Sequence, residues 1–165
     1  MAALPPGVLA PDFKLPTMDG TEFSLTEALR TGPVILAFFK ISCPVCQYAF
    51  PLYERLARQL KGTGVGVIGV SQDSLEDTAS FMREFGITFT VALDDTTSYK
   101  VSNGYGLTNV PTMFEISPDG QVEATVVGWS RSDVEALHRK YVNADDALTV
   151  PLFQASERLE NFKAG

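Results

Sequence analysis

The chain has 165 residues, 45% of them hydrophobic, which is enough apolar material for the core of one globular domain. Its formal net charge of −7 argues against a nucleic-acid-binding surface and against adhesion to anionic membranes. No apolar run approaches membrane-spanning length, and residues 1–6 lack the charged and apolar regions of a secretory signal, so we expect a cytoplasmic protein in a reducing compartment.

Strand and helix patterns alternate along the chain. In the first half of the chain we expect a hairpin (13–25), a helical turn (26–30), a buried strand (33–39), a helix (44–61), a strand (65–70) and a helix (75–85). In the second half we expect a short strand (91–93), a loop or weak helix (99–107) and two antiparallel strands (110–116 and 122–127). A helix that Ser132 caps and that ends at residue 141 follows, and then a short helix through residues 159 and 162. Pro51 lies inside the second helix and should kink it. This order predicts an α/β sandwich with a mixed sheet.

The only two cysteines, Cys43 and Cys46, lie where the first buried strand turns into a helix. A helix start leaves backbone N–H groups unpaired and carries the positive end of the helix dipole. We expect Cys43 at the cap and Pro44 in the first helical position, so that Val45 and Cys46 supply the N–H donors to the Cys43 sulfur. Both effects favour the thiolate, the form that attacks disulfides and that peroxides oxidise. The spacing therefore predicts Cys43 as the nucleophile and Cys46 as the resolving thiol.

A Cys-x-x-Cys pair can also be half of a zinc site or simple core filling. Structural zinc needs four ligands, and the only other soft ligand here is His138, so we expect no metal; no other cofactor is indicated. A buried strand, Cys-Pro-x-Cys and a helix in succession favour redox chemistry over core filling.

Together these residues resemble the thioredoxin-like superfamily, and within it the redoxin group of TlpA/ResA-type thiol–disulfide oxidoreductases and AhpC/TSA peroxiredoxins. The resemblance covers residues 10–143. It implies a thioredoxin-like fold: a mixed central β-sheet flanked by helices, with an N-terminal β-hairpin and a β-α insertion before a cis-proline strand. Residues 1–165 then form a single domain, with residues 144–165 as a C-terminal extension.

The resemblance also implies roles for particular residues. Cys43 and Cys46 match the redox pair, and Pro51 matches the proline of the active-site helix. The segment Val110-Pro111-Thr112 is similar to the cis-proline segment that faces the cysteines, where the backbone at Val110 would pair with a substrate chain. Gly128 is similar to the glycine that closes the substrate groove.

The chain departs from the family patterns at positions that select the activity. Peroxiredoxins carry a Pro-x-x-x-Thr/Ser-x-x-Cys motif, and here Leu36 and Lys40 occupy its proline and threonine positions. The nearest arginine downstream of Pro111 is Arg131, so the peroxide-orienting residues are not recognisable.

The acidic residues of the related oxidoreductases are missing too. Ala37 replaces the buried aspartate of thioredoxins, and Ala49 the glutamate of TlpA/ResA relatives. Water or Lys40 is left to take the proton from Cys46. Lys40 could equally favour the thiolate of Cys43 by its charge, or be a solvated lysine at a strand end.

The remaining candidates have simpler interpretations. We expect His138 on the surface. Solvated loop charges are expected at Asp94, Asp95, Asp145 and Asp146. Aromatic residues that could line the groove, but are more often core, are Phe39, Tyr48 and Trp129.

Three functions are compatible with these observations. The first is a thiol–disulfide oxidoreductase in which Cys43 forms a mixed disulfide with a partner and Cys46 resolves it. The second is an AhpC/TSA-type peroxidase in which Cys43 passes through sulfenic acid. The third is a non-enzymatic redox-sensing or interaction module with the tail around Leu152-Phe153 as its contact surface. The expected partners are a protein or small-molecule disulfide or thiol (or a peroxide) and a thiol reductant, with no nucleic acid and no membrane.

Overall fold

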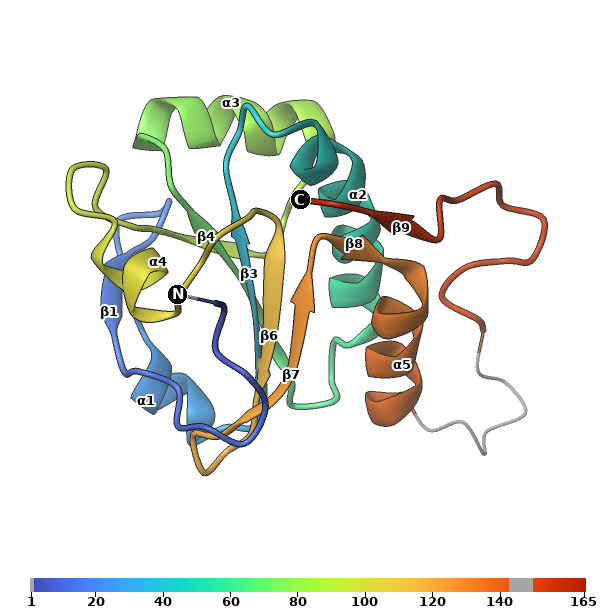
Figure 1. Ribbon diagram of the computed structural model, residues 1–165, viewed down its shortest axis with the longest axis horizontal. Coiled ribbons are helices and arrows are strands. Elements are labelled where there is room, and N and C mark those ends of the chain that lie inside the picture. The colour runs from blue at the N-terminus through green and yellow to red at the C-terminus, as the bar shows by residue number, and fades with distance from the viewer. Residues whose placement is uncertain (1, 143–149) are drawn as a thin grey trace.

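The computed structural model describes residues 2–142 and 150–165, and at its centre lies a five-stranded mixed sheet of order β5-β4-β3-β6-β7 (Figure 1). Its strands are β3 (Val34–Phe39), β4 (Gly66–Ser71), β5 (Thr90–Leu93), β6 (Thr112–Ile116) and β7 (Val122–Val127). Strands β3, β4 and β5 are parallel, and β6 is antiparallel to both β3 and β7. The predicted mixed sheet is confirmed.

Helices cover both faces of this sheet (Figure 1). They are α1 (Leu25–Leu29), α2 (Pro44–Gln59), α3 (Leu75–Phe85), α4 (Lys100–Gly104) and α5 (Arg131–Tyr141). One core cluster joins α2, α3 and α5 to Ile35, Ala37 and Phe39, and the other joins the N-terminal segment, α1 and α4 to the alternate residues of β3. Because β3 is buried on both faces, its sequence is a continuous apolar run. No helix in residues 2–142 and 150–165 is long and apolar enough to cross a membrane.

Two small sheets complete the fold. Strands β1 (Lys14–Pro16) and β2 (Glu22–Ser24) form the predicted hairpin. Strands β8 (Trp129–Ser130) and β9 (Phe162–Lys163) pair antiparallel and join the C-terminal extension to the domain.

The ends of the last elements differ from expectation. Helix α5 is capped by Ser130, whose side chain accepts the Asp133 N–H at 3.3 Å, and not by Ser132. The short helix predicted through residues 159 and 162 is wrong, because residues 162–163 form β9. Pairing with β8 satisfies the backbone there, whereas an isolated short helix has a costly nucleus.

Two polar residues that the sequence predicts to be on the surface, His138 and Asp94, are buried. His138 is buried, and its Nε2 lies 2.6 Å from Gln59 Oε1. Asp94 is buried and accepts hydrogen bonds from the N–H groups of Val101 and Ser102, so it holds the first turns of α4. Asp145 and Asp146 lie outside the described residues.

The tail residues Leu152 and Phe153 are buried against the domain. The prediction that they form an exposed contact surface is therefore wrong. Their large apolar side chains gain more from packing on α2 and Trp129 than from exposure to water.

Glu54 is a buried carboxylate that ties α2 to the segment before β5. It is 5% exposed and accepts hydrogen bonds from the Thr88 N–H (2.7 Å), the Phe89 N–H (3.2 Å) and Arg58 Nε (2.8 Å). Burial raises the pKa of Glu54, but the hydrogen bonds from Thr88, Arg58 and Phe89 outweigh it, so the pKa is lowered from 4.5. The charged form of Glu54 is therefore the stabilising one.

Replacing Glu54 with glutamine should lower the free energy of unfolding near pH 7 by about 1–3 kcal/mol. Because the folded-state pKa lies below the unfolded-state value of 4.5, the contribution of the charge is complete above that pH and declines as the pH falls through the folded-state value. Urea unfolding at pH 7 and pH 3.5 would measure this, with the exposed Glu84→Gln as control. An equal loss at both pH values would contradict the charge-based account.

Candidate active site

The start of α2 holds the Cys43 sulfur. Cys43 is the N-cap residue and Pro44 the first residue of the helix, as predicted. The Cys46 N–H donates to Cys43 Sγ at 3.4 Å. Within the part of the chain that the structure describes, no hydrogen bond joins the Val45 N–H to this sulfur, so the second predicted donor is not found. The Val45 side chain packs, half-buried, against the core.

The two thiols differ in access. Cys43 is half-buried, and it lines a pocket. Cys46 is fully buried, and burial raises the pKa of the Cys46 thiol, against the lowering effect of the Lys40 backbone. A reachable sulfur in front of an enclosed, protonated one suits a nucleophile and a resolving thiol.

The segment Val110-Pro111-Thr112 lies against Cys43. The thiol of Cys43 donates to the Val110 carbonyl oxygen at 3.3 Å. The peptide bond between Val110 and Pro111 is cis, as the resemblance implied. Thr112 is buried, and its Oγ1 donates to the Asn109 carbonyl at 2.8 Å, which holds the loop before β6. The chain thus brings together residues 43 and 110–112, which are 67 positions apart at the closest contact.

A pocket of about 480 Å³ opens beside Cys43. Its walls are mostly polar and come from the ends of β3 and β4, from α4 and from the loop before β6. They include Lys40, Gln72, Ser102, Asn103, Thr108, Asn109, Val110 and Gly165. Lys40 is exposed and supplies the cation among these lining residues. Gln72, Asn109 and Gly165 were not predicted as site residues.

Asp73 is a further residue that the sequence interpretation missed. Its carboxylate accepts the Ile41 N–H at 2.8 Å and so braces the loop that leads into Cys43. Its charge also contributes to the raised pKa of Cys46. The sequence did contain a signal for Asp73, because this residue follows the buried strand β4 as Cys43 follows β3. The two strands are parallel neighbours, and their carboxyl ends meet at one edge of the sheet.

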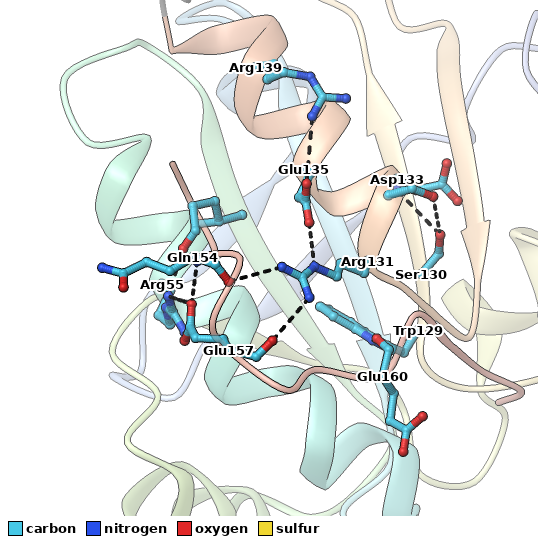
Figure 2. A network of polar contacts seen from close by, with 12 residues as sticks. Arg55, Trp129, Ser130, Arg131, Asp133, Glu135, Arg139, Gln154, Glu157 and Glu160 are labelled. Atoms are coloured by element: carbon cyan, nitrogen blue, oxygen red, sulfur yellow. Dashed lines mark hydrogen bonds and ion pairs between the residues drawn. The ribbon is translucent and has the colours of Figure 1, made fainter. Parts of the chain in front are cut away.

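The other candidates do not join the pocket. Phe39 is fully buried in the core, and so are Ala37 and Ala49, where related proteins carry acids. Arg131 lies in another network: its guanidinium donates to the carbonyl groups of Gln154 and Glu157 (Figure 2).

The fold and the site together define a thioredoxin-like protein with a Cys-x-x-Cys pair at the start of α2. The sequence matches the AhpC/TSA family over residues 6–125, and the chain belongs to this family.

Known proteins with related sequences support the same class. The chain is 30% identical to the thiol-disulfide oxidoreductase ResA of Bacillus subtilis (strain 168) over 135 residues. This matched region is 81% of this chain and 72% of the relative. It is 32% identical over 124 residues to ResA of Geobacillus thermodenitrificans (strain NG80-2), covering 74% and 69%. A solved thiol:disulfide interchange protein from Chlorobium tepidum TLS superposes with a TM-score of 0.69 at 28% identity, covering 85% of this chain and 99% of that one. The predicted family and fold are confirmed.

Proposed function

We propose that this protein is a thiol–disulfide oxidoreductase that works through Cys43 and Cys46. The observation that carries the proposal is the pairing of the pocket-lining Cys43, whose sulfur receives the Cys46 amide at 3.4 Å, with an enclosed thiol one helical turn behind it. The similarity to proteins named ResA supports the same activity.

The reaction has two exchange steps. In the first, the Cys43 thiolate attacks one sulfur of a substrate disulfide; that S–S bond breaks, a mixed disulfide forms, and the other substrate sulfur leaves as a thiolate that takes up a proton. In the second, Cys46 loses its proton and attacks Cys43 Sγ, which releases the second substrate thiol and leaves a Cys43–Cys46 disulfide. Two electrons pass from the protein to the substrate, and a separate thiol reductant returns them.

Control of the second thiol follows from its burial. Because burial raises the pKa of Cys46, this thiol stays protonated and does not compete with Cys43 for the substrate. We further propose that water or Lys40 accepts the Cys46 proton and that the protein acts in the cytoplasm with a thiol as its reductant.

A peroxidase is the second candidate, because the AhpC/TSA family match favours it. Against a peroxidase, Leu36 and Lys40 occupy the proline and threonine positions of the peroxiredoxin motif. In addition, Arg131 contacts Gln154 and Glu157 instead of the pocket. The site therefore supports disulfide exchange better than peroxide activation.

Single-turnover rates of the reduced protein with hydroxyethyl disulfide and with hydrogen peroxide would test the assignment. We expect the disulfide to oxidise the dithiol faster than an equal concentration of peroxide, because no peroxide-orienting side chain lines the described pocket. Cys43→Ser should reduce both rates to background. A peroxide rate that exceeds the disulfide rate would replace the first function with the second.

A further inference from the structure

The described part of the C-terminal extension is anchored on α2 and α5. The ring of Phe153 lies between two guanidinium groups, with Arg55 at 5.1 Å and Arg131 at 5.7 Å from its centroid. Arg55 also donates to the Leu152 carbonyl at 2.7 Å and to the Glu157 carboxylate at 2.6 Å (Figure 2). Side-chain packing and charged hydrogen bonds therefore fix residues 152–157 to the domain.

Beyond this anchor, the chain crosses to the active site. The indole N–H of Trp129 donates to the Glu160 carbonyl at 2.7 Å, and the Glu160 N–H donates to the Tyr48 hydroxyl at 2.8 Å. Strand β9 then pairs with β8, and Lys163 Nζ lies 5.1 Å from the centre of the Tyr48 ring. In Figure 1, β9 leads towards the beginning of α2.

The last residues lie on the backbone beside Cys43. Asn109 Nδ2 donates to the Gly165 carbonyl at 2.8 Å, and a Cβ added to Gly165 would lie 2.6 Å from the Val110 carbonyl oxygen. The Lys163 carbonyl lies so close to Gly128 that a Cβ there would clash with it. Gly165 also lines the same pocket as Cys43. Residues 163–165 thus run from Gly128 to Val110.

This position matters for an extended substrate. The Val110 carbonyl accepts the Cys43 thiol at 3.3 Å, so the Val110 backbone lies directly beside a polypeptide that brings a disulfide to Cys43. Gly165 already lies against this part of the Val110 backbone. A small disulfide needs no such backbone contact, and the pocket of about 480 Å³, which Cys43 and Gly165 both line, gives it access to the sulfur while Gly165 stays in place.

We propose that residues 160–165, here named the strap, select among disulfide substrates: small disulfides reach Cys43 with the strap docked, whereas polypeptide disulfides must displace it. The proposal rests on the proposed disulfide exchange and adds a substrate preference to it. The strap is held by one two-residue strand pair and a few single hydrogen bonds, and Phe162 within it is 61% exposed. Segments with so few buried contacts open at low free energy.

Lys163 offers a matched pair of variants. The Arg131 N–H donates to the Asn161 carbonyl at 2.9 Å, so Lys163, two residues further and opposite Trp129, is again at a hydrogen-bonded position of the antiparallel pair. Lys163→Pro removes this backbone donor, and Lys163→Ala keeps it while removing the side-chain cation.

The experiment compares kcat/KM for hydroxyethyl disulfide and for a synthetic peptide disulfide. Lys163→Pro should raise the peptide value about two- to tenfold, the effect of losing one backbone hydrogen bond, and leave the small-disulfide value unchanged. For Lys163→Ala, kcat/KM for both disulfides should stay closer to the values of the original chain. If Lys163→Pro leaves the ratio of kcat/KM for the peptide disulfide to kcat/KM for hydroxyethyl disulfide unchanged, the proposed role of the strap is wrong. If the original chain turns over neither disulfide, the proposed function itself fails.

Trp129, the only tryptophan, gives a second readout. When Cys46→Ser protein forms its mixed disulfide with the peptide, displacement of the strap should shift Trp129 emission to the red, and the hydroxyethyl adduct should not. Identical emission from both adducts would contradict displacement. Should Lys163→Pro lose its small-disulfide activity through misfolding, Tyr48→Phe repeats the comparison, because it removes only the acceptor of the Glu160 N–H.

Discussion

Replacing Cys46 with serine is expected to stop the reaction at the mixed disulfide. Cys43 keeps its place at the start of α2, because the amide that contacts its sulfur belongs to the backbone of residue 46 and is unchanged by the substitution. The serine hydroxyl cannot attack a disulfide, so steady-state turnover should fall to background. After incubation with hydroxyethyl disulfide, intact mass spectrometry should show one adduct per chain, and a reductant should remove it.

Cys43→Ser is the control for this experiment. It leaves Cys46 as the only thiol, and this thiol is fully buried with a raised pKa, so the same incubation should give no adduct. An adduct on Cys46 that forms as fast as the one on Cys43 would reverse the two roles.

Truncation of Phe153 to alanine should lower the free energy of unfolding by about 3–5 kcal/mol, as for other buried phenylalanines. The ring is 5% exposed, meets the Trp129 ring edge-on at 5.9 Å and lies between the guanidinium groups of Arg55 and Arg131. Its removal leaves a cavity and takes the anchor from the extension. Urea unfolding followed by Trp129 fluorescence would measure the loss.

Two further variants interpret the result. Phe153→Leu keeps most of the buried apolar volume and should cost less, whereas Val150→Ala changes a residue that is 61% exposed and should stay within about 0.5 kcal/mol. A Phe153→Ala protein as stable as Val150→Ala would show that the extension does not share the cooperative fold. That outcome would contradict a single domain that includes residues 150–165.

The sequence predicted the features that depend on local order along the chain. Six consecutive apolar residues at positions 34–39 predicted a strand buried on both faces, and all six are buried. Proline directly after Cys43 predicted the helix start, because that position requires no N–H. The cis bond before Pro111 was expected only from the family resemblance.

Features that depend on contacts between distant residues were not readable. Asp94 and His138 look like surface residues in sequence, since nothing adjacent shows that Ser102 and Gln59 will meet them. The helix expected through 159 and 162 was wrong for the same reason: the partner strand begins at Trp129, far earlier in the chain.

The sequence by itself therefore determined the strand and helix pattern up to the C-terminal extension and the placement of two thiols at a helix start, because hydrophobic period, proline and capping act between near neighbours. Only the tertiary structure decided which backbone lies beside Cys43. The Tyr48 hydroxyl and the Glu160 amide are 112 positions apart, and the contact between Gly165 and Asn109 spans 56. Such contacts form because the segment anchored at Phe153 brings the last residues to the end of the sheet where Cys43 lies. A local sequence pattern contains no signal for contacts between residues so far apart in the chain.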